Sequence, residues 1–360
     1  MDELEYEGLL VNTIPGLEDI VAEEILTILR DKKVFIKERP YGLGGKVIAK
    51  GDVTLQDAIL LMKLGRSLEK VILLIKVGEV GRSKKDLNQL YDEIYTVPFE
   101  RIVTPFSRIA VRAQREGIHE YTSIDVASIV GQAVIDKIKK VYGIRPPVDL
   151  RSPTTVVYVE VIGDKFIVGI DLSKGKGLHA RDYRIFVHPA ALRPTIAYAL
   201  LKIAGVKDNE IVLDPMCGSG TILIEAALSF KNIKLYGMDI NREYLIGTRK
   251  SAVKAGVADK IILKVGDVRR LEKEFMGMKF DRIVTNPPYG IRMKPKDIKR
   301  IYLGLIKGAK TLLRNGGTLT IITTKHKLAK NIASKFKLNI IHERRIYLGG
   351  LYPHILVFTN

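Results

Sequence analysis

Between residues 190 and 323 the chain alternates regularly between short apolar runs and longer segments with helical spacing. The apolar runs are rich in Ile, Val and Leu, which is typical of strands buried on both faces. Strand–helix alternation of this kind predicts an α/β fold with a doubly wound parallel sheet. We expect strands within 210–220, 233–240, 260–268, 280–290 and 316–323, and helices within 192–205, 221–230, 242–256 and 299–313.

The residues before this region mix strand-like and helix-like segments over shorter distances. Residues 1–60 and residues 61–172 each have the pattern of a small α+β domain. The stretch 173–189 is glycine-rich and basic and has no periodicity, so we expect a linker there. The sequence therefore predicts three domains, the last of which covers residues 190–360.

The charge of the chain is strongly positive and unevenly distributed. The formal net charge is +19, yet residues 1–60 hold 7 basic and 12 acidic groups, so the other 300 residues carry +24. Polyanions such as nucleic acids are the natural partners of a basic surface. A basic surface that only contacts solvent is the simpler alternative.

Cysteine usage and hydropathy indicate the compartment. Cys217 is the only cysteine, which excludes a disulfide framework and a thiolate metal cluster. The acidic N-terminus lacks a signal-peptide pattern, and no apolar run approaches the length of a membrane span. We expect a soluble cytoplasmic protein that needs no metal and acts as a monomer.

The first strand of the α/β region runs into a glycine loop, LDPMCGSGT at 213–221. Gly218 and Gly220 allow the backbone to approach a ligand closely, and the next helix offers free N–H groups. A dinucleotide fingerprint would need a third glycine where Leu223 stands, and a phosphate-binding P-loop would need a Gly-Lys-Ser/Thr sequence. The loop therefore predicts a ligand without phosphates.

Two further strands end in carboxylates. Asp239 lies 19 residues beyond Gly220, where a carboxylate can accept both hydroxyls of a ribose. Asp267 follows the next strand and could accept a hydrogen bond from an adenine amine. Ligands of such sheets bind at the carboxyl ends of the strands. Together the three strand ends indicate a nucleoside ligand, and S-adenosylmethionine fits this description.

A fourth strand ends in NPPYG at 286–290. An exocyclic amine is a poor nucleophile, because its lone pair is delocalised into the ring. Asn286 can accept a hydrogen bond from one amine proton and the Pro287 carbonyl from the other. The prolines fix these acceptors, and Tyr289 can stack on a base that has left its helix. A simple turn is the alternative interpretation of this stretch.

The combination DPMCGSGT, GMDI, GDV and NPPYG resembles the Rossmann-fold methyltransferases that modify exocyclic amines. Residues 175–225 are similar to the THUMP-domain RNA methyltransferases, in particular to the archaeal and bacterial TrmN-type tRNA (guanine-N2)-methyltransferases of the acceptor stem. The relatives that modify the tRNA elbow usually have Asp where this chain has Asn286. The resemblance implies a ferredoxin-like N-terminal domain over 1–60 and a THUMP domain over 61–172.

The resemblance also implies the reaction and its residues. The expected reaction is direct methyl transfer from S-adenosylmethionine to the N2 amine of a guanosine, at tRNA position 6. The expected catalytic residues are Asn286, Pro287 and Tyr289. The segment 188–195 is expected to fold over the methionine end of the cofactor, although a simple helix start at Pro194 is equally compatible. The expected cofactor-binding residues are Leu192, Arg193, Pro194, Thr195, Asp214, Cys217, Gly218, Ser219, Gly220, Thr221, Asp239, Ile240, Asp267, Val268 and Asn286.

RNA contacts are expected from the basic part of the second domain. The strand pattern around 107–117 alternates apolar residues with arginines and could expose a basic face. The resemblance implies that the THUMP domain grips the tRNA 3′ end, which would set the distance to the acceptor-stem target. The basic loop 290–300 could clamp the target strand. The residues expected to bind RNA are Arg108, Arg112, Arg115 and Arg145.

Other interpretations remain open. Adenine-N6 methylation of RNA or DNA uses the same amine chemistry, and a tRNA-binding protein with a vestigial pocket would need no catalysis. Cys217 as a covalent nucleophile is disfavoured, because it lies in the cofactor loop. His326 and His342 are expected to be structural or at the surface.

Overall fold

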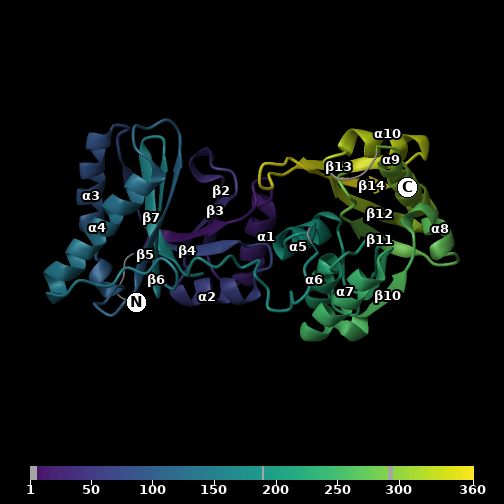
Figure 1. Cartoon of the computed structure of the whole chain (residues 1–360), viewed down its shortest axis with the longest axis horizontal. Coiled ribbons are helices and arrows are strands. Elements are labelled where there is room, and N and C mark those ends of the chain that lie inside the picture. Colours follow the sequence, from purple (N-terminus) through teal and green to yellow (C-terminus); the bar gives the residue numbers. More distant parts are fainter. Residues whose placement is uncertain (1–5, 189, 291–294) are drawn as a thin grey trace. The chain divides into compact units, whose positions relative to one another are not determined.

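The computed structural model describes residues 6–188, 190–290 and 295–360. It separates into two compact units (Figure 1). The first unit comprises Met1–Thr13 and Val21–Leu178, and the second comprises Ile14–Ile20 and His179–Asn360. No helix of the described residues is long and apolar enough to cross a membrane.

The first unit is built on one seven-stranded sheet with the order β2-β3-β1-β4-β7-β6-β5. The pairs are antiparallel, except that β5 runs parallel to β6. β4 pairs with β1 on one side and with β7 on the other, so the sheet continues across the predicted boundary at residue 60. The strands are β1 (Gly8–Asn12), β2 (Val34–Glu38), β3 (Lys46–Gly51), β4 (Lys70–Glu79), β5 (Ile109–Glu116), β6 (Thr155–Ile162) and β7 (Lys165–Asp171).

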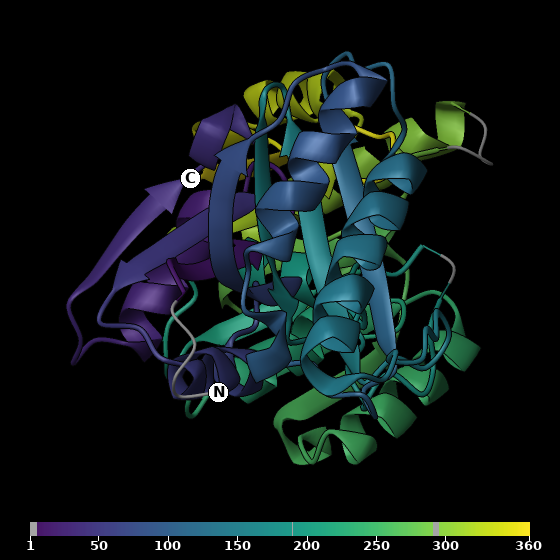
Figure 2. The ribbon, with the colours of Figure 1, turned by 90° about the vertical axis from the view of Figure 1, so that its left-hand side faces the viewer.

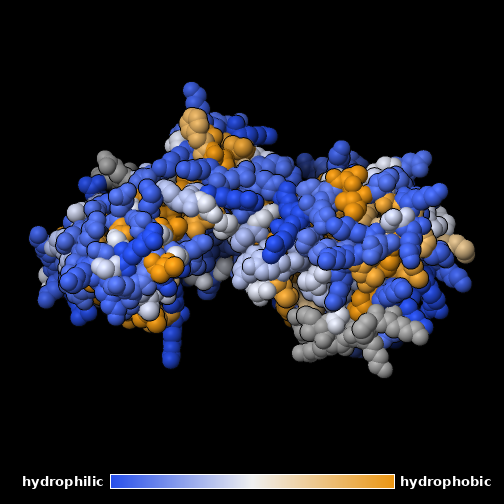
Figure 3. Space-filling model, turned by 90° about the horizontal axis from the view of Figure 1, so that it is seen from above, coloured by the Kyte–Doolittle hydropathy of each residue, from blue (hydrophilic) through white to orange (hydrophobic). Residues whose placement is uncertain are grey.

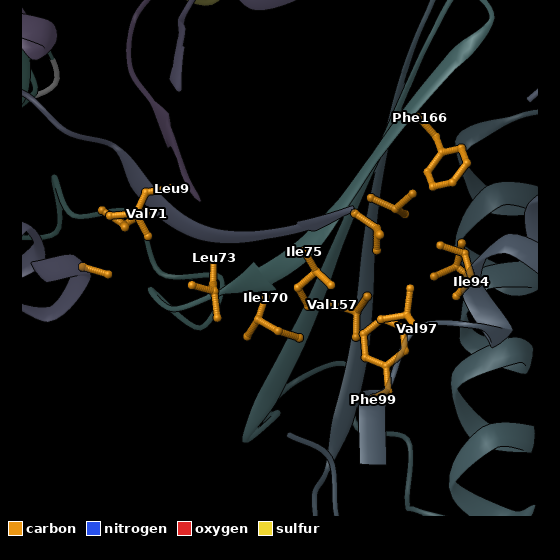
Figure 4. Close-up of a cluster of buried hydrophobic side chains, with 14 of the residues drawn as sticks. Leu9, Val71, Leu73, Ile75, Ile94, Val97, Phe99, Val157, Phe166 and Ile170 are labelled. Carbon is orange, nitrogen blue, oxygen red and sulfur yellow. The ribbon is translucent and has the colours of Figure 1, made fainter. Parts of the chain in front are cut away.

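Four helices pack on one face of this sheet. Their apolar residues share a single core with alternate residues of the strands, such as Leu9, Leu73 and Val157 (Figure 4). α3 and α4 lie side by side against this face (Figure 2). The helices are α1 (Glu18–Ile28), α2 (Leu55–Leu64), α3 (Leu87–Tyr95) and α4 (Ser123–Tyr142).

The other face of the sheet holds a buried polar network. Lys46 on β3 and Glu160 on β6 form an ion pair, with 2.8 Å between Nζ and Oε2. The Tyr158 hydroxyl donates to the same carboxylate at 2.6 Å. Four strand spacings separate β3 from β6, roughly 19 Å in a flat sheet. The sheet must therefore curl strongly around this face for these side chains to meet.

The second unit contains the predicted doubly wound sheet, with the order β10-β9-β8-β11-β12-β14-β13. The first five strands in this order are parallel, as expected, and β14 is antiparallel to both of its neighbours. The sheet is therefore mixed. The strands are β8 (Ile211–Asp214), β9 (Lys234–Asp239), β10 (Ile261–Val265), β11 (Phe280–Thr285), β12 (Leu313–Thr323), β13 (Asn339–Arg345) and β14 (His354–Thr359).

Helices cover both faces of this sheet, which confirms the doubly wound prediction. Apolar residues of α5, α6 and α7 form one core with it, and those of α8, α9 and α10 form another. As a result, the carboxyl ends of the parallel strands meet at one edge. The helices are α5 (Pro194–Ile203), α6 (Thr221–Ser229), α7 (Arg242–Lys254), α8 (Leu271–Glu274), α9 (Pro295–Leu312) and α10 (His326–Lys335).

Candidate active site

The glycine loop after β8 is held against the ends of β8 and β9. The Cys217 amide donates to the Met238 carbonyl at 2.9 Å, and the Thr248 hydroxyl donates to the Gly218 carbonyl at 2.8 Å. Gly220 has φ of +72°, and a Cβ there would collide with Thr248. Gly218 has φ of +52°, and no heavy atom of the described residues, apart from its chain neighbours, lies within 4 Å of a Cβ built there. The loop backbone therefore borders open space at Gly218, as a ligand cradle requires.

Asp239 organises this loop and keeps acceptor capacity. One carboxylate oxygen accepts from the Gly218 amide at 2.9 Å, and the other accepts from the Asn241 amide at 2.9 Å. A carboxylate offers about four acceptor positions, so about two are left for a ligand. The half-buried side chain therefore fits the predicted contact with ribose hydroxyls.

Asp267 already has a cationic partner. Its carboxylate accepts from Arg269 Nε at 2.8 Å and from Arg269 Nη2 at 2.5 Å. The Arg269 side chain holds the pKa of this carboxyl below its usual range. The predicted adenine contact would therefore use the remaining acceptor positions. Of its expected companions, Val268 is buried, whereas Ile240 is 64% exposed and offers an apolar surface beside Asp239.

Asp214 is fully enclosed at the end of β8. Its Oδ1 accepts from the Thr285 hydroxyl at 2.7 Å and from the Met216 amide at 3.2 Å. It therefore connects the glycine loop to the last residue of β11. Burial raises the pKa of Asp214 to about 7.

This shift predicts a pH dependence of stability. The pKa of Asp214 is higher in the folded chain than in the unfolded chain, where it is near 3.8. The folded chain therefore binds a proton at this carboxyl more tightly, and the stability that this proton contributes is complete below pH 4. This contribution is lost as the pH rises to about 7, and the free energy of unfolding then falls by about 4 kcal/mol at most. Asp214→Asn should flatten the curve of unfolding free energy against pH between 4 and 7, as measured by chemical denaturation. Thr285→Val should extend the loss to higher pH while its onset stays near pH 4, since it removes the hydroxyl that favours the charged form and so raises only the folded pKa. A wild-type slope in Asp214→Asn would contradict the assignment.

Asn286 directly follows β11. Its Nδ2 donates to the Ala190 carbonyl at 3.3 Å, which fixes the orientation of the amide. Its Oδ1 is buried and has no hydrogen-bond partner among the described residues. A buried acceptor without a partner is costly unless a ligand supplies the donor. The predicted acceptor for an amine proton therefore has no competing donor in the part of the chain that the structure describes.

We call residues 286–289 the acceptor arm, and its Pro288 carbonyl is held by a buried tyrosine. The buried Tyr302 hydroxyl donates to the Pro288 carbonyl at 3.5 Å and shares a 2.5 Å hydrogen bond with Thr323. Burial raises the pKa of the Tyr289 phenol, which keeps this ring neutral. Gly290 has φ of +81°, so the chain also turns here. A turn at Gly290 and an acceptor arm before it are thus compatible interpretations of this stretch.

The predicted basic loop 290–300 falls partly on residues 291–294, which lie outside the described residues.

The segment before α5 reaches Asn286. The Ala190 carbonyl contacts the Asn286 amide, as noted above, and Leu192 and Thr195 are buried. Pro194 is the first residue of α5 and Arg193 is its N-cap, so the simple helix start is also present. Ala190, Thr248, Thr285 and Tyr302 were not predicted as part of the site.

The other predicted cofactor-binding residues of the glycine loop have buried side chains. Cys217 is buried, and burial raises the pKa of its thiol well above the ordinary value, which disfavours a thiolate nucleophile. Ser219 and Thr221 are buried, with 3.4 Å between their hydroxyl oxygens. Among the described residues no group of three or more His, Cys, Asp or Glu side chains could hold a metal ion.

In the first unit, the arginines do not form a single face. Arg112 is exposed on the edge strand β5, and its Nη2 donates to the Leu150 carbonyl at 2.7 Å. Arg108 shares the side of Arg112, and its Nε lies 3.5 Å from Asp149 Oδ2. Arg115 is an odd number of residues from Arg112 and points to the opposite side, where its Nη1 donates to the Gly117 carbonyl at 2.7 Å. Arg108 and Arg112 therefore share one side of β5, and Arg115 lies on the other side. Arg145 is exposed in the loop after α4.

Comparison with known proteins defines the class. Residues 181–354 match the model of the RMKL-like methyltransferase domain, and residues 84–171 match that of the THUMP domain. The second unit is accordingly a Rossmann-fold methyltransferase domain, and S-adenosylmethionine is its methyl donor.

Full-length relatives define the family. The chain is 36% identical to the tRNA (guanine(6)-N2)-methyltransferase of Archaeoglobus fulgidus, over 96% of this chain and 90% of the relative. It is 33% identical to the enzyme of the same name from Methanocaldococcus jannaschii, over 97% and 99%. The crystal structure of TrmN from Thermus thermophilus superposes with a TM-score of 0.83 at 28% identity, covering 98% of this chain and 99% of that one. The chain belongs to the family of the tRNA (guanine-N2)-methyltransferases with a THUMP domain.

Proposed function

We propose that this chain methylates the exocyclic N2 amine of a guanosine in the acceptor stem of tRNA, at position 6. The observation that carries the proposal is the buried Asn286 Oδ1, which is oriented by Ala190 and lacks a donor among the described residues. The relatives cited above are named for methylation of guanine 6 in tRNA. An amine proton of the target base supplies the donor that this oxygen lacks.

The residues of the site account for the chemistry. S-adenosylmethionine, when bound, supplies a methyl group on a positively charged sulfur. Asn286 Oδ1 and the Pro287 carbonyl accept the two amine protons, which restores electron density to the nitrogen and aims its lone pair. Tyr302 and Thr323 brace the arm through the Pro288 carbonyl, so the acceptors are in place before the base arrives.

Tyr289 provides a ring against which the extruded base can stack. The amine has a low pKa and loses its proton easily after methylation, so the reaction needs no strong base. His326 lies beyond β12 and stacks on His354, with 3.9 Å between the ring centroids. This arrangement fits a structural role for His326.

The test is a single-turnover transfer of labelled methyl from S-adenosylmethionine to an unmodified tRNA transcript. Mass spectrometry of the digested product should identify N2-methylguanosine, and the tRNA fragment masses should locate it at position 6. N6-methyladenosine would instead establish the adenine alternative. Binding of cofactor and tRNA without any transfer would indicate a non-catalytic tRNA-binding protein.

RNA binding by the first unit gives a separate prediction. Because Arg108 and Arg112 share one side of β5, we expect this side to contact tRNA phosphates. Arg112→Ala should weaken tRNA binding and lower the slope of log affinity against log salt by about one unit. Arg115→Ala tests the opposite side of β5 in the same way, and an unchanged slope there would confine the phosphate contacts to the side of Arg112. Fluorescence anisotropy at several salt concentrations measures both, and equal slopes for Arg112→Ala and the wild type would contradict the assignment.

A further inference from the structure

The connection between β13 and β14 is a short, well-formed hairpin with exposed aromatic rings. We call residues 345–354 the tyrosine hairpin. Leu348 and Leu351 pair through two backbone hydrogen bonds of 2.8 and 3.1 Å around the turn Gly349-Gly350. Both glycines have positive φ, and among the described residues only their chain neighbours lie within 4 Å of a Cβ built on either. The tip is therefore a tight turn, and both of its glycines are exposed.

Two tyrosines and an arginine form the surface of this hairpin. The rings of Tyr347 and Tyr352 are 40% and 51% exposed, with centroids 5.2 Å apart. The Arg345 guanidinium lies over the Tyr352 ring, 4.1 Å from its centroid. Such a cation–π arrangement holds the arginine and the ring in a fixed relation. Exposed tyrosines carrying an arginine match the stacking surfaces that bind unpaired nucleotides.

The base of the hairpin is anchored, so its rings are presented from a rigid support. Ile346 is buried in the core of the second unit, and its amide donates to the Pro353 carbonyl at 3.0 Å. The Tyr347 amide donates to the Pro15 carbonyl, also at 3.0 Å. Nearby, Arg344 makes a bidentate ion pair with Asp19, with distances of 2.6 and 2.7 Å. Little ordering is therefore needed when a ligand binds.

The hairpin emerges at the same edge of the sheet as the candidate active site. His354, the first residue of β14, pairs with Thr323 at the carboxyl end of β12. β12 in turn pairs with β11, which leads into Asn286. Two strand spacings, roughly 10 Å, thus separate the base of the hairpin from the strand that carries the acceptor.

The surrounding sequence is strongly basic. Residues 324–354 contain seven Lys or Arg residues and one acidic residue, Glu343. Glu343 is already neutralised, because its carboxylate lies 2.9 Å from Lys330 Nζ. Lys325 and Lys327 are exposed at the start of α10. A protein partner would be expected to face a less uniformly charged surface, so the charge around the hairpin favours a polyanion.

Hydrophilic residues also dominate the surface seen in Figure 3, where hydrophobic residues form separate patches.

We propose that the tyrosine hairpin binds the RNA strand next to the methylated nucleotide, by stacking Tyr347 and Tyr352 on bases that become unpaired when the target leaves its helix. Arg345 contributes a phosphate contact. This inference rests on the proposed function, since it assigns the flanking strand of the same RNA to a surface beside the same site.

The test combines direct binding with transfer. The full-length chain and a labelled unmodified tRNA transcript are used, and anisotropy gives the RNA affinity without any turnover. Tyr347→Ala and Tyr352→Ala should each weaken RNA binding about 5- to 100-fold, the size of one lost stacking contact. Tyr347→Phe and Tyr352→Phe keep the ring and should bind as the wild type does. Met276→Ala is the matched control, because Met276 is 83% exposed and lies before β11, at the opposite edge of the sheet.

The outcomes separate this inference from the proposed function. The affinity for S-adenosylmethionine, measured by calorimetry, should be unchanged in all these variants and reports that the second unit is folded. Wild-type RNA affinity in both alanine variants would overturn the inference, and so would an equal loss in the phenylalanine variants. A wild-type product other than N2-methylguanosine would overturn the proposed function alone, because the binding measurement does not depend on which base is methylated.

Discussion

Asn286→Ala should lower the single-turnover rate of methyl transfer by about 100- to 1000-fold. This is the size expected for one oriented polar group that acts on charge developing in the transition state. The buried Oδ1 has no other partner among the described residues, so its acceptor role is not shared with the fold. The affinities for cofactor and tRNA should change far less, because the contact forms chiefly with the extruded base.

Asn286→Asp is the informative comparison. The carboxylate keeps an acceptor oxygen but loses the Nδ2 donor to the Ala190 carbonyl, so it should retain partial activity with a less well fixed orientation. Labelled methyl transfer to unmodified tRNA measures both variants. A near-normal rate in Asn286→Ala, with N2-methylguanosine still formed, would leave the enzyme class intact and eliminate this mechanism.

Asp239→Ala should weaken S-adenosylmethionine binding by roughly 10- to 100-fold. The loss corresponds to about 1.5–3 kcal/mol for a charged acceptor to buried hydroxyls. The same carboxylate accepts from the Gly218 amide, so its removal also loosens the loop that faces the ligand. Isothermal titration calorimetry with the cofactor measures the effect.

A second variant separates these two contributions. Asp239→Asn keeps an oxygen for the Gly218 amide but loses acceptor capacity toward the ribose, so it should bind cofactor with intermediate affinity. The free energy of unfolding should fall less in Asp239→Asn than in Asp239→Ala. Unchanged cofactor affinity in Asp239→Ala would remove this residue from the site.

The sequence was most informative where a strand ends. The alternation of strand and helix patterns predicted the sheet, and a parallel sheet brings its carboxyl ends together regardless of the loop details. Asp239 and Asn286 could therefore be assigned to one edge from sequence position alone. The contact between Asp214 and Thr285 could not be, because it joins residues 71 positions apart through strand order.

Arg115 shows a second limit of prediction from the sequence, namely the direction in which a side chain points. Strict alternation along β5 places it on the side opposite Arg112, so the period of two was sufficient to separate these residues. The prediction that these arginines contact RNA followed their local density in the sequence, which says nothing about the direction of each side chain. The Ala190 carbonyl was also missed, because a backbone oxygen leaves no signature in the side-chain pattern.

The continuity of the first sheet limits how the chain can be shortened. A fragment that starts after residue 60 would keep β4 but lose β1, its partner along residues 70–74. It would expose an unpaired strand edge together with the apolar side chains Val71 and Leu73, which is the usual template for aggregation. It would also leave Glu160 buried without Lys46. The smallest fragment that keeps the THUMP domain in its native sheet should therefore include β1 and β3, even though the THUMP match begins only at residue 84.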